Sequence, residues 1–207
     1  MRPLPRLHAV TDGRVLALPD LGIRAAAIAS AGPAVALHAR DRGAGGAALA
    51  RAALRLQALA RPPEAALVVS GRPDLAAAIG AAGVQLGADD LAPGEARRVF
   101  PAGWIGRSVH DAREAEAAVA EGADFLVVGS VYPTASHPAL AAAGPALVRA
   151  AAALGRPVIA IGGIDTARAV EMREAGAWGV AAIRALWDAA DPAAAAIALL
   201  APWLEDA

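Results

Sequence analysis

The stretch PVIAIGGIDTARAVEMREAGAWGVAAI, residues 157–183, contains the pattern that decides the fold. An apolar run over 157–162 predicts a buried strand, the segment 166–175 predicts a helix, and a second apolar run over 179–184 predicts another strand. Gly176 and Ala177 stand between this helix and the second strand, where a helix cap belongs. A strand, a helix and a strand in this order indicate a right-handed βαβ unit with parallel strands.

The same unit recurs along the chain. EGADFLVVG, residues 121–129, repeats the Gly-Ala step before an apolar run. The remaining strands are predicted at 7–11, 34–39, 66–70, 83–86, 104–109 and 125–131, and the remaining helices near 20–31, 45–60, 73–82, 92–99, 111–121, 141–154 and 191–204. Eight strand–helix pairs predict an α/β fold, a (β/α)8 TIM barrel, as a single domain over residues 1–207. An open doubly wound sheet is the alternative, but no G-x-G-x-x-G follows the first strand.

Composition excludes several classes of function. The 207 residues have a net charge of −1 and no cysteine, and all 19 basic residues are arginine, which excludes Schiff-base lysines and the P-loop lysine. Only 3% of the residues are aromatic and the cations are not clustered, so no nucleic-acid partner is expected. Neither a membrane-spanning run nor a secretory leader is found, and we expect a cytoplasmic protein that binds a small molecule, with a homodimer left open.

A phosphate site is predicted at the loop after the strand over 157–162. Gly162 and Gly163 would let backbone N–H groups approach an anion, assisted by the backbone near Ile183 and by Arg184 after the last strand. Barrels often bind phosphate at these two loops. The alternative is a tight turn that needs glycine for its conformation.

His110 is the candidate catalytic residue. It ends the strand over 104–109, two residues after Ser108, and its ordinary pKa suits proton transfer near neutral pH. The alternative is a histidine that caps the following helix. His8, at the start of the first strand, is expected to be structural. The other candidate substrate-binding residues also follow strands, namely His38, Arg40, Arg72, Ser108, Ser130, Thr134 and His137.

No metal site is predicted. Asp89 and Asp90 could hold magnesium, but no second carboxylate follows the strand over 66–70. We therefore expect these two residues to cap the helix over 92–99.

Seven motifs resemble the thiamine phosphate synthase/TenI superfamily in order and spacing. They are HAVTD, SGRPDLA, GVQLG, IGRSVH, GSVYPT, PVIAIGGI and GAWGVAAI, and they cover residues from about 7 to 187. The resemblance implies a (β/α)8 barrel that handles a thiazole phosphate in thiamin biosynthesis.

The branch within the superfamily depends on a few positions. Synthases typically have Q-L-R-E-K after strand two, N-D-R after strand three and a T-P-T-K loop after strand six. In this chain His38 and Arg40 fall in the first motif, Gly71 replaces the magnesium-binding aspartate, and His137 replaces a lysine. The resemblance to TenI proteins in S-V-H implies that His110 transfers protons in a thiazole tautomerase, which needs no cofactor.

The expected activity is therefore an isomerase that aromatises a carboxythiazole phosphate tautomer. One alternative is thiamine phosphate synthase, a transferase that joins hydroxymethylpyrimidine diphosphate and thiazole phosphate and would need Mg²⁺. The other is a regulator that binds a thiazole or thiamin phosphate without catalysis.

Overall fold

Eight parallel strands form a closed barrel in the computed structural model, which describes residues 3–60, 64–134 and 142–204. Each strand pairs with its neighbours in chain order, and β8 closes the ring on β1. The strands are β1 (Leu7–Val10), β2 (Val35–Ala39), β3 (Ala66–Ser70), β4 (Gly83–Leu86), β5 (Trp104–Val109), β6 (Phe125–Val128), β7 (Val158–Ile161) and β8 (Gly179–Ala182). The prediction of a single-domain (β/α)8 barrel is confirmed, whereas the domain limits of 1 and 207 stay a prediction.

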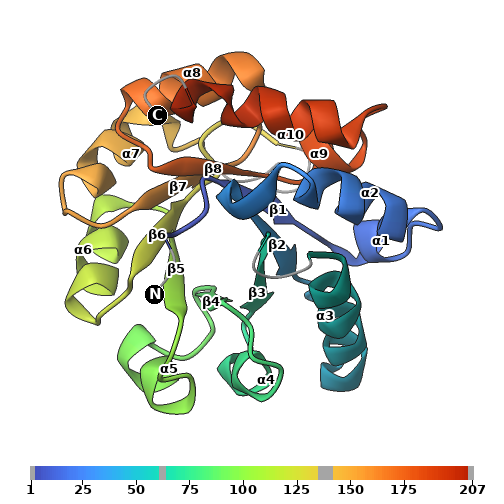
Figure 1. The fold of residues 1–207 in the computed structure, drawn as a ribbon. Coiled ribbons are helices and arrows are strands. Elements are labelled where there is room, and N and C mark those ends of the chain that lie inside the picture. The colour runs from blue at the N-terminus through green and yellow to red at the C-terminus, as the bar shows by residue number, and fades with distance from the viewer. Residues whose placement is uncertain (1–2, 61–63, 135–141, 205–207) are drawn as a thin grey trace.

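Helices surround the strands on the outside of the ring (Figure 1). They are α1 (Gly13–Leu16), α2 (Leu21–Ala29), α3 (Gly46–Ala60), α4 (Pro73–Ala78), α5 (Pro93–Val99), α6 (Ala112–Ala120), α7 (Gly144–Ala152), α8 (Thr166–Glu174), α9 (Arg184–Trp187) and α10 (Pro192–Leu200), with short 3-10 turns at Gly32–Ala34 and Ala201–Trp203. No helix within the described ranges is long and apolar enough to cross a membrane.

The apolar residues of each strand alternate between two cores. Outward-facing residues such as Leu37 and Ile105 pack against the helices, while inward-facing residues such as Val68 and Phe125 fill the barrel. Gly106 leaves room inside for the Phe125 ring and the Gln85 amide, because a side chain at this position would collide with both. The closed ring thus brings all eight strand ends to one face.

The glycines that end α6 and α8 confirm the cap pattern. Gly122 has φ +90° and Gly176 has φ +89°, a backbone conformation that glycine adopts without strain. The next residue, Ala123 or Ala177, donates its N–H to a carbonyl of the last helical turn, at 3.0 and 2.9 Å. Each helix is turned back in this way toward the amino end of the next strand.

Two predicted strands extend too far by two residues or more. β6 ends at Val128 instead of residue 131, although Val131 is fully buried, so hydrophobicity continues beyond the ladder. β8 ends at Ala182, and Arg184 does not close the strand but begins the short helix α9. Both corrections concern loops at the same face of the barrel.

Candidate active site at the carboxyl ends of the strands

Polar side chains enter the barrel from one side of the ring, from His8 on β1 round to β5. His38, Ser70, Gln85 and Ser108 lie at inward-facing positions of the adjacent strands β2 to β5. The corresponding interior of β6 to β8 is apolar, with Val127, Ile159, Ile161 and Ala181. The interior near the mouth therefore has one polar wall and one apolar wall, an arrangement suited to a flat heteroaromatic ligand.

His38 is buried in the barrel and bonded to a second histidine. Its Nε2 lies 2.7 Å from Nδ1 of His8 on β1, and Nε2 of His8 lies 3.1 Å from the Pro5 carbonyl. Burial lowers the pKa of His8 to about 4. Burial, followed by the nearby His8 and Arg40, lowers the pKa of His38 well below its usual range. Both rings are neutral near pH 7, so the expectation that His8 is structural agrees with its position.

Arg40 is a half-buried cation on the loop after β2. The Thr11 hydroxyl accepts its N–H at 3.0 Å and lies 3.0 Å from its carbonyl, which fixes the backbone. Burial lowers the pKa of Arg40, and repulsion by Arg42 lowers it further, although arginine stays protonated in proteins. Within the part of the chain that the structure describes, no carboxylate forms an ion pair with Arg40. An anionic substrate would offset this unfavourable charge.

Gln85 is a residue that the sequence analysis missed. Its amide donates to the Ser108 hydroxyl at 3.1 Å, but its buried Oε1 has no hydrogen-bond partner. The Ser70 hydroxyl, on the neighbouring strand, also lacks a partner. Buried polar atoms are usually paired in folded proteins, so these two are polar groups that the fold leaves unsatisfied inside the barrel. One polar residue in the apolar strand GVQL was the signal that could have identified Gln85.

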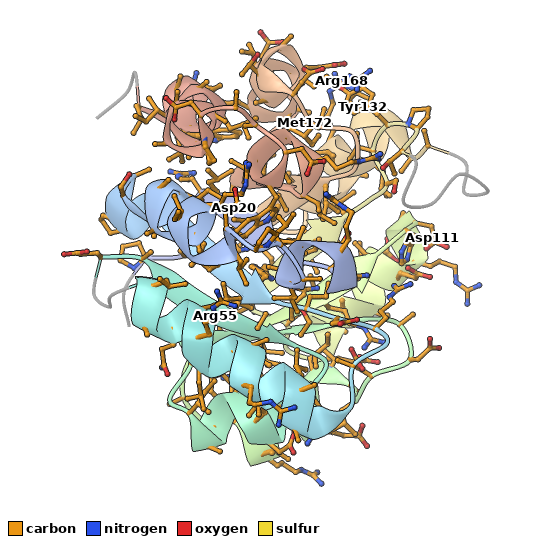
Figure 2. The ribbon with its side chains drawn as sticks, turned by 90° about the vertical axis from the view of Figure 1, so that its right-hand side faces the viewer. Asp20, Arg55, Asp111, Tyr132, Arg168 and Met172 are labelled. Atoms are coloured by element: carbon orange, nitrogen blue, oxygen red, sulfur yellow. The ribbon has the colours of Figure 1, made fainter. Side chains whose placement is uncertain are left out.

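Gly162 and Gly163 form a tight loop after β7. Gly162 has φ +106° and lies against the backbone of Ser130, while Gly163 has φ +66° and lies against Tyr132. Arg168 fixes the loop by donating to the Gly163 carbonyl, and its guanidinium lies 4.4 Å from the centre of the Tyr132 ring (Figure 2). Close packing on the loop after β6 therefore requires glycine here whether or not an anion binds.

The loops after β7 and β8 also present backbone donors. The register Ile161↔Ala181 places the two loops side by side. Among the described residues, no acceptor is found for the N–H groups of Gly162, Gly163 or Ile183. Arg184 donates to the Thr134 hydroxyl at 3.2 Å, across to the loop after β6. Backbone N–H groups beside a guanidinium make a suitable phosphate site, as the sequence predicts.

His110 is an exposed residue that directly follows β5, two positions after Ser108. Its Nδ1 is 3.0 Å from a carboxylate oxygen of Glu114, and its backbone N–H donates to the same oxygen at 2.7 Å. The side chain is 46% exposed. Asp111 is the N-cap of α6 and accepts from the Glu114 N–H at 2.8 Å. Asp111, not His110, therefore caps this helix, and the role of His110 stays a prediction.

Three further candidates occupy different positions. Arg72 is exposed and forms two hydrogen bonds with Asp74, at 2.8 and 2.6 Å, which lower the pKa of that carboxyl to about 2. Ser130 lies in the loop after β6, where its carbonyl accepts from the Ala143 N–H at 2.9 Å. His137 lies outside the described residues. The structure therefore brings Arg184 and Thr134 together but holds Arg72 in a separate rim pair.

The carboxylates beside the mouth fit a magnesium ion only in part. Asp90 does not cap α5, whose N-cap is Ala92; instead its Oδ2 accepts from the Gly87 N–H at 2.6 Å. A side chain at Gly71 would begin 3.0 Å from Oδ1 of Asp90, so an aspartate there would add a second ligand. No group of three potential ligands occurs in the described ranges. Mg²⁺ is often held by one or two carboxylates together with phosphate oxygens, and Asp90 would supply one such carboxylate.

A separate cavity of about 510 Å³ opens at the opposite end of the barrel. Arg6 and Trp178 line it, and the Arg6 guanidinium lies 3.5 Å from the centre of the Trp178 ring and donates to its carbonyl at 2.7 Å. Reactions in this fold occur at the carboxyl ends of the strands, so the cavity is not the candidate active site.

Comparisons with known proteins identify the family. The sequence profile of a family described as thiamine monophosphate synthase matches residues 7–186. The chain belongs to this family. It is 43% identical to the thiamine-phosphate synthase of Salinispora tropica, over 97% of this chain and 98% of that relative. It is 47% identical to the thiamine-phosphate synthase of Thermus thermophilus, over 70% of this chain and 71% of that relative.

A solved structure agrees with this assignment. The thiamine phosphate pyrophosphorylase from Pyrococcus furiosus superposes with a TM-score of 0.81 at 31% identity, over 97% of this chain and 96% of that one. The superfamily resemblance is therefore confirmed.

The predicted isomerase activity is wrong. The similar relatives are named thiamine-phosphate synthase, not thiazole tautomerase, and so support the transferase that stood as the alternative. The prediction relied on the S-V-H motif, which gives the position of a histidine in the sequence but does not determine the contacts of its side chain. Here that side chain bonds to Glu114.

Proposed function

We propose that the chain is a thiamine-phosphate synthase, a transferase that joins hydroxymethylpyrimidine diphosphate to thiazole phosphate with release of diphosphate. One observation carries the proposal beyond the names of the relatives: the mouth has two separate regions that favour anions. The loops after β7 and β8 present backbone N–H groups and Arg184, whereas the loop after β2 presents Arg40 and Arg42. Two anionic substrates require two such regions, and a transferase must hold both at once.

The loops after β7 and β8 would hold the phosphate of the thiazole. Gly162, Gly163 and Ile183 would donate backbone N–H groups, and Arg184 would add a charge-assisted hydrogen bond. The apolar wall next to this site, with Ile161 and Ile183, would contact the thiazole ring. The ring nitrogen is then free to face the centre of the mouth.

The diphosphate would lie on the other side, near Arg40 and Arg42. In the reaction the bond between the pyrimidine methylene carbon and the diphosphate oxygen breaks, and the same carbon forms a bond to the thiazole nitrogen. The leaving diphosphate keeps the electron pair of the broken bond, so cations beside it stabilise the transition state. Magnesium, held by Asp90 and the diphosphate oxygens, would supply further positive charge when bound.

Arginines take the place of lysines in this arrangement. Arg40 stays protonated at all working pH values despite its burial, and its planar group can form two hydrogen bonds to phosphate oxygens. The described carboxylates nearby accept backbone N–H groups instead: Asp12 caps α1 by accepting from Val15, and Asp41 accepts from Gly43 within its own loop. Neither is in direct contact with Arg40.

The test is a direct assay of the purified chain. It is incubated with both substrates and magnesium, and thiamin phosphate and diphosphate are measured by mass spectrometry and an enzymatic diphosphate assay. We expect equal amounts of the two products, and neither product when one substrate is omitted. If both substrates remain unchanged over many hours with magnesium present, the proposal fails.

A further inference from the structure

The hydrogen bond between His8 and His38 has only one arrangement of protons. The Pro5 carbonyl can only accept, so Nε2 of His8 must carry a proton for its 3.1 Å bond. A neutral imidazole has one N–H, which leaves a lone pair on Nδ1 of His8. Nε2 of His38, 2.7 Å away, must then be the donor. The neutral His38 ring consequently has its lone pair on Nδ1.

Nδ1 of His38 is therefore an acceptor without a partner in the described part of the chain. His38 is 2% exposed. Its Nδ1 has no partner among the described residues but is not fully buried, unlike the Ser70 hydroxyl and the Gln85 Oε1. Burial, His8 and Arg40 all lower the pKa of His38, so His38 adds no positive charge to the mouth. The Thr11 hydroxyl lies 2.9 Å from the His38 carbonyl and holds the strand end in place.

A second acceptor lies on the same polar wall. Gln85 is 9% exposed, and its Oε1 is buried without a partner, while the Ser70 hydroxyl between β2 and β4 can donate or accept. The Gln85 and Ser70 atoms are fully buried, so His38 Nδ1 is the acceptor on this wall that a ligand can reach, and an unpaired acceptor is complementary to a ligand that presents an N–H group. It is not complementary to a diphosphate, which presents only acceptors.

We propose that His8 is a positioning residue that fixes His38 as a hydrogen-bond acceptor for the amino group of a substituted heteroaromatic ring. This inference rests on the proposed function, in which that ring is the aminopyrimidine. His38 then determines specificity, because a ring without the amino group leaves the buried lone pair unsatisfied. His8 acts through His38 and does not touch the substrate.

The first test measures the proton positions. Nitrogen NMR of the full chain labelled with ¹⁵N-histidine distinguishes protonated from unprotonated ring nitrogens. At pH 7 we expect His38 to carry its proton on Nε2 alone. His8→Leu removes the acceptor for that proton and should populate the other tautomer, whereas His8→Asn, which keeps an acceptor near the Nδ1 position, should preserve it. A charged His38, a proton on Nδ1 in the parent, or no change in His8→Leu would overturn the proposal.

The second test measures binding by calorimetry. The probes are the hydroxymethyl aminopyrimidine and the same compound without its amino group. We expect the parent to prefer the amino compound by about tenfold to a hundredfold, as for a buried hydrogen bond. His38→Leu should lose this preference and His38→Asn should keep part of it, with thermal unfolding as a check that both variants fold. An unchanged preference in His38→Leu contradicts the proposal. Neither test requires turnover. A chain that makes no thiamin phosphate would therefore contradict the proposed function but not the role of His8 and His38.

Discussion

Replacing Arg40 with methionine should weaken substrate binding without weakening the fold. Methionine keeps part of the length of the side chain and removes the charge together with the N–H donors. Arg40 is half-buried and no described carboxylate pairs with it. Burial and repulsion by Arg42 lower its pKa by more than attraction to Asp12 and Asp41 raises it, so its charge costs stability in the free protein. The melting temperature should therefore stay unchanged or rise, as is common when a functional charge is removed.

The loss of affinity should be large for one substrate only. Hydrogen bonds to charged groups contribute about 1.5–3 kcal/mol, which corresponds to an increase of about tenfold to a hundredfold in KM for the pyrimidine diphosphate. KM for the thiazole phosphate should stay within about threefold, because that anion is held by other loops. Steady-state kinetics with one substrate varied at a time gives both values.

Arg72→Met is the matched control. Arg72 is an arginine of the same face but is exposed and paired with Asp74, so its loss should change either KM by less than about threefold. If Arg40→Met binds the diphosphate substrate like the parent, or if Arg72→Met weakens it equally, the assignment of Arg40 is refuted.

Three further predictions concern the other parts of the site. Gly163→Ala should raise KM for the thiazole phosphate at least about tenfold, because the added Cβ narrows the loop. Gly155 has a similar φ of +76° and open space around it, so Gly155→Ala should lower only the melting temperature. Equal KM values in the two variants would contradict the phosphate site. EDTA should abolish turnover and magnesium should restore it. Asp90→Asn should raise the magnesium concentration needed for half-maximal rate about tenfold or more. A rate that is insensitive to EDTA would exclude magnesium from the reaction. His110→Gln should change kcat by less than about threefold, since the ring is exposed and bonded to Glu114; a loss of about a hundredfold or more would place His110 in the reaction after all.

The barrel could be predicted because its signals are local. β3, β4 and β5 were predicted with the bounds that the structure has, since each is a short apolar run set off by glycine, proline or charge. The end of β6 could not be located, because Val131 stays buried after the ladder has stopped. Burial determines which residues are hydrophobic, whereas hydrogen-bonded pairing with the neighbouring strand determines where a strand ends.

The sequence predicts those parts of the site that depend on a local pattern, but not the contacts between residues that are distant in the chain. Gly162 and Gly163 follow an apolar strand, a pattern visible without any tertiary contact. The bond between His8 and His38 joins residues 30 positions apart, and it depends on the register of β1 on β2, which no local pattern contains. Likewise, the sequence places Arg40 and Arg72 at equivalent strand ends, but only the structure shows that Asp74 binds one of them.

A crystal structure of the chain with thiamin phosphate, diphosphate and magnesium tests the central claim most directly. The account predicts two anions at one mouth: the phosphate of thiamin phosphate on the N–H groups of Gly162, Gly163 and Ile183, and diphosphate beside Arg40 with magnesium on Asp90. A single anion site, or a diphosphate bound away from Arg40 and Asp90, would contradict it.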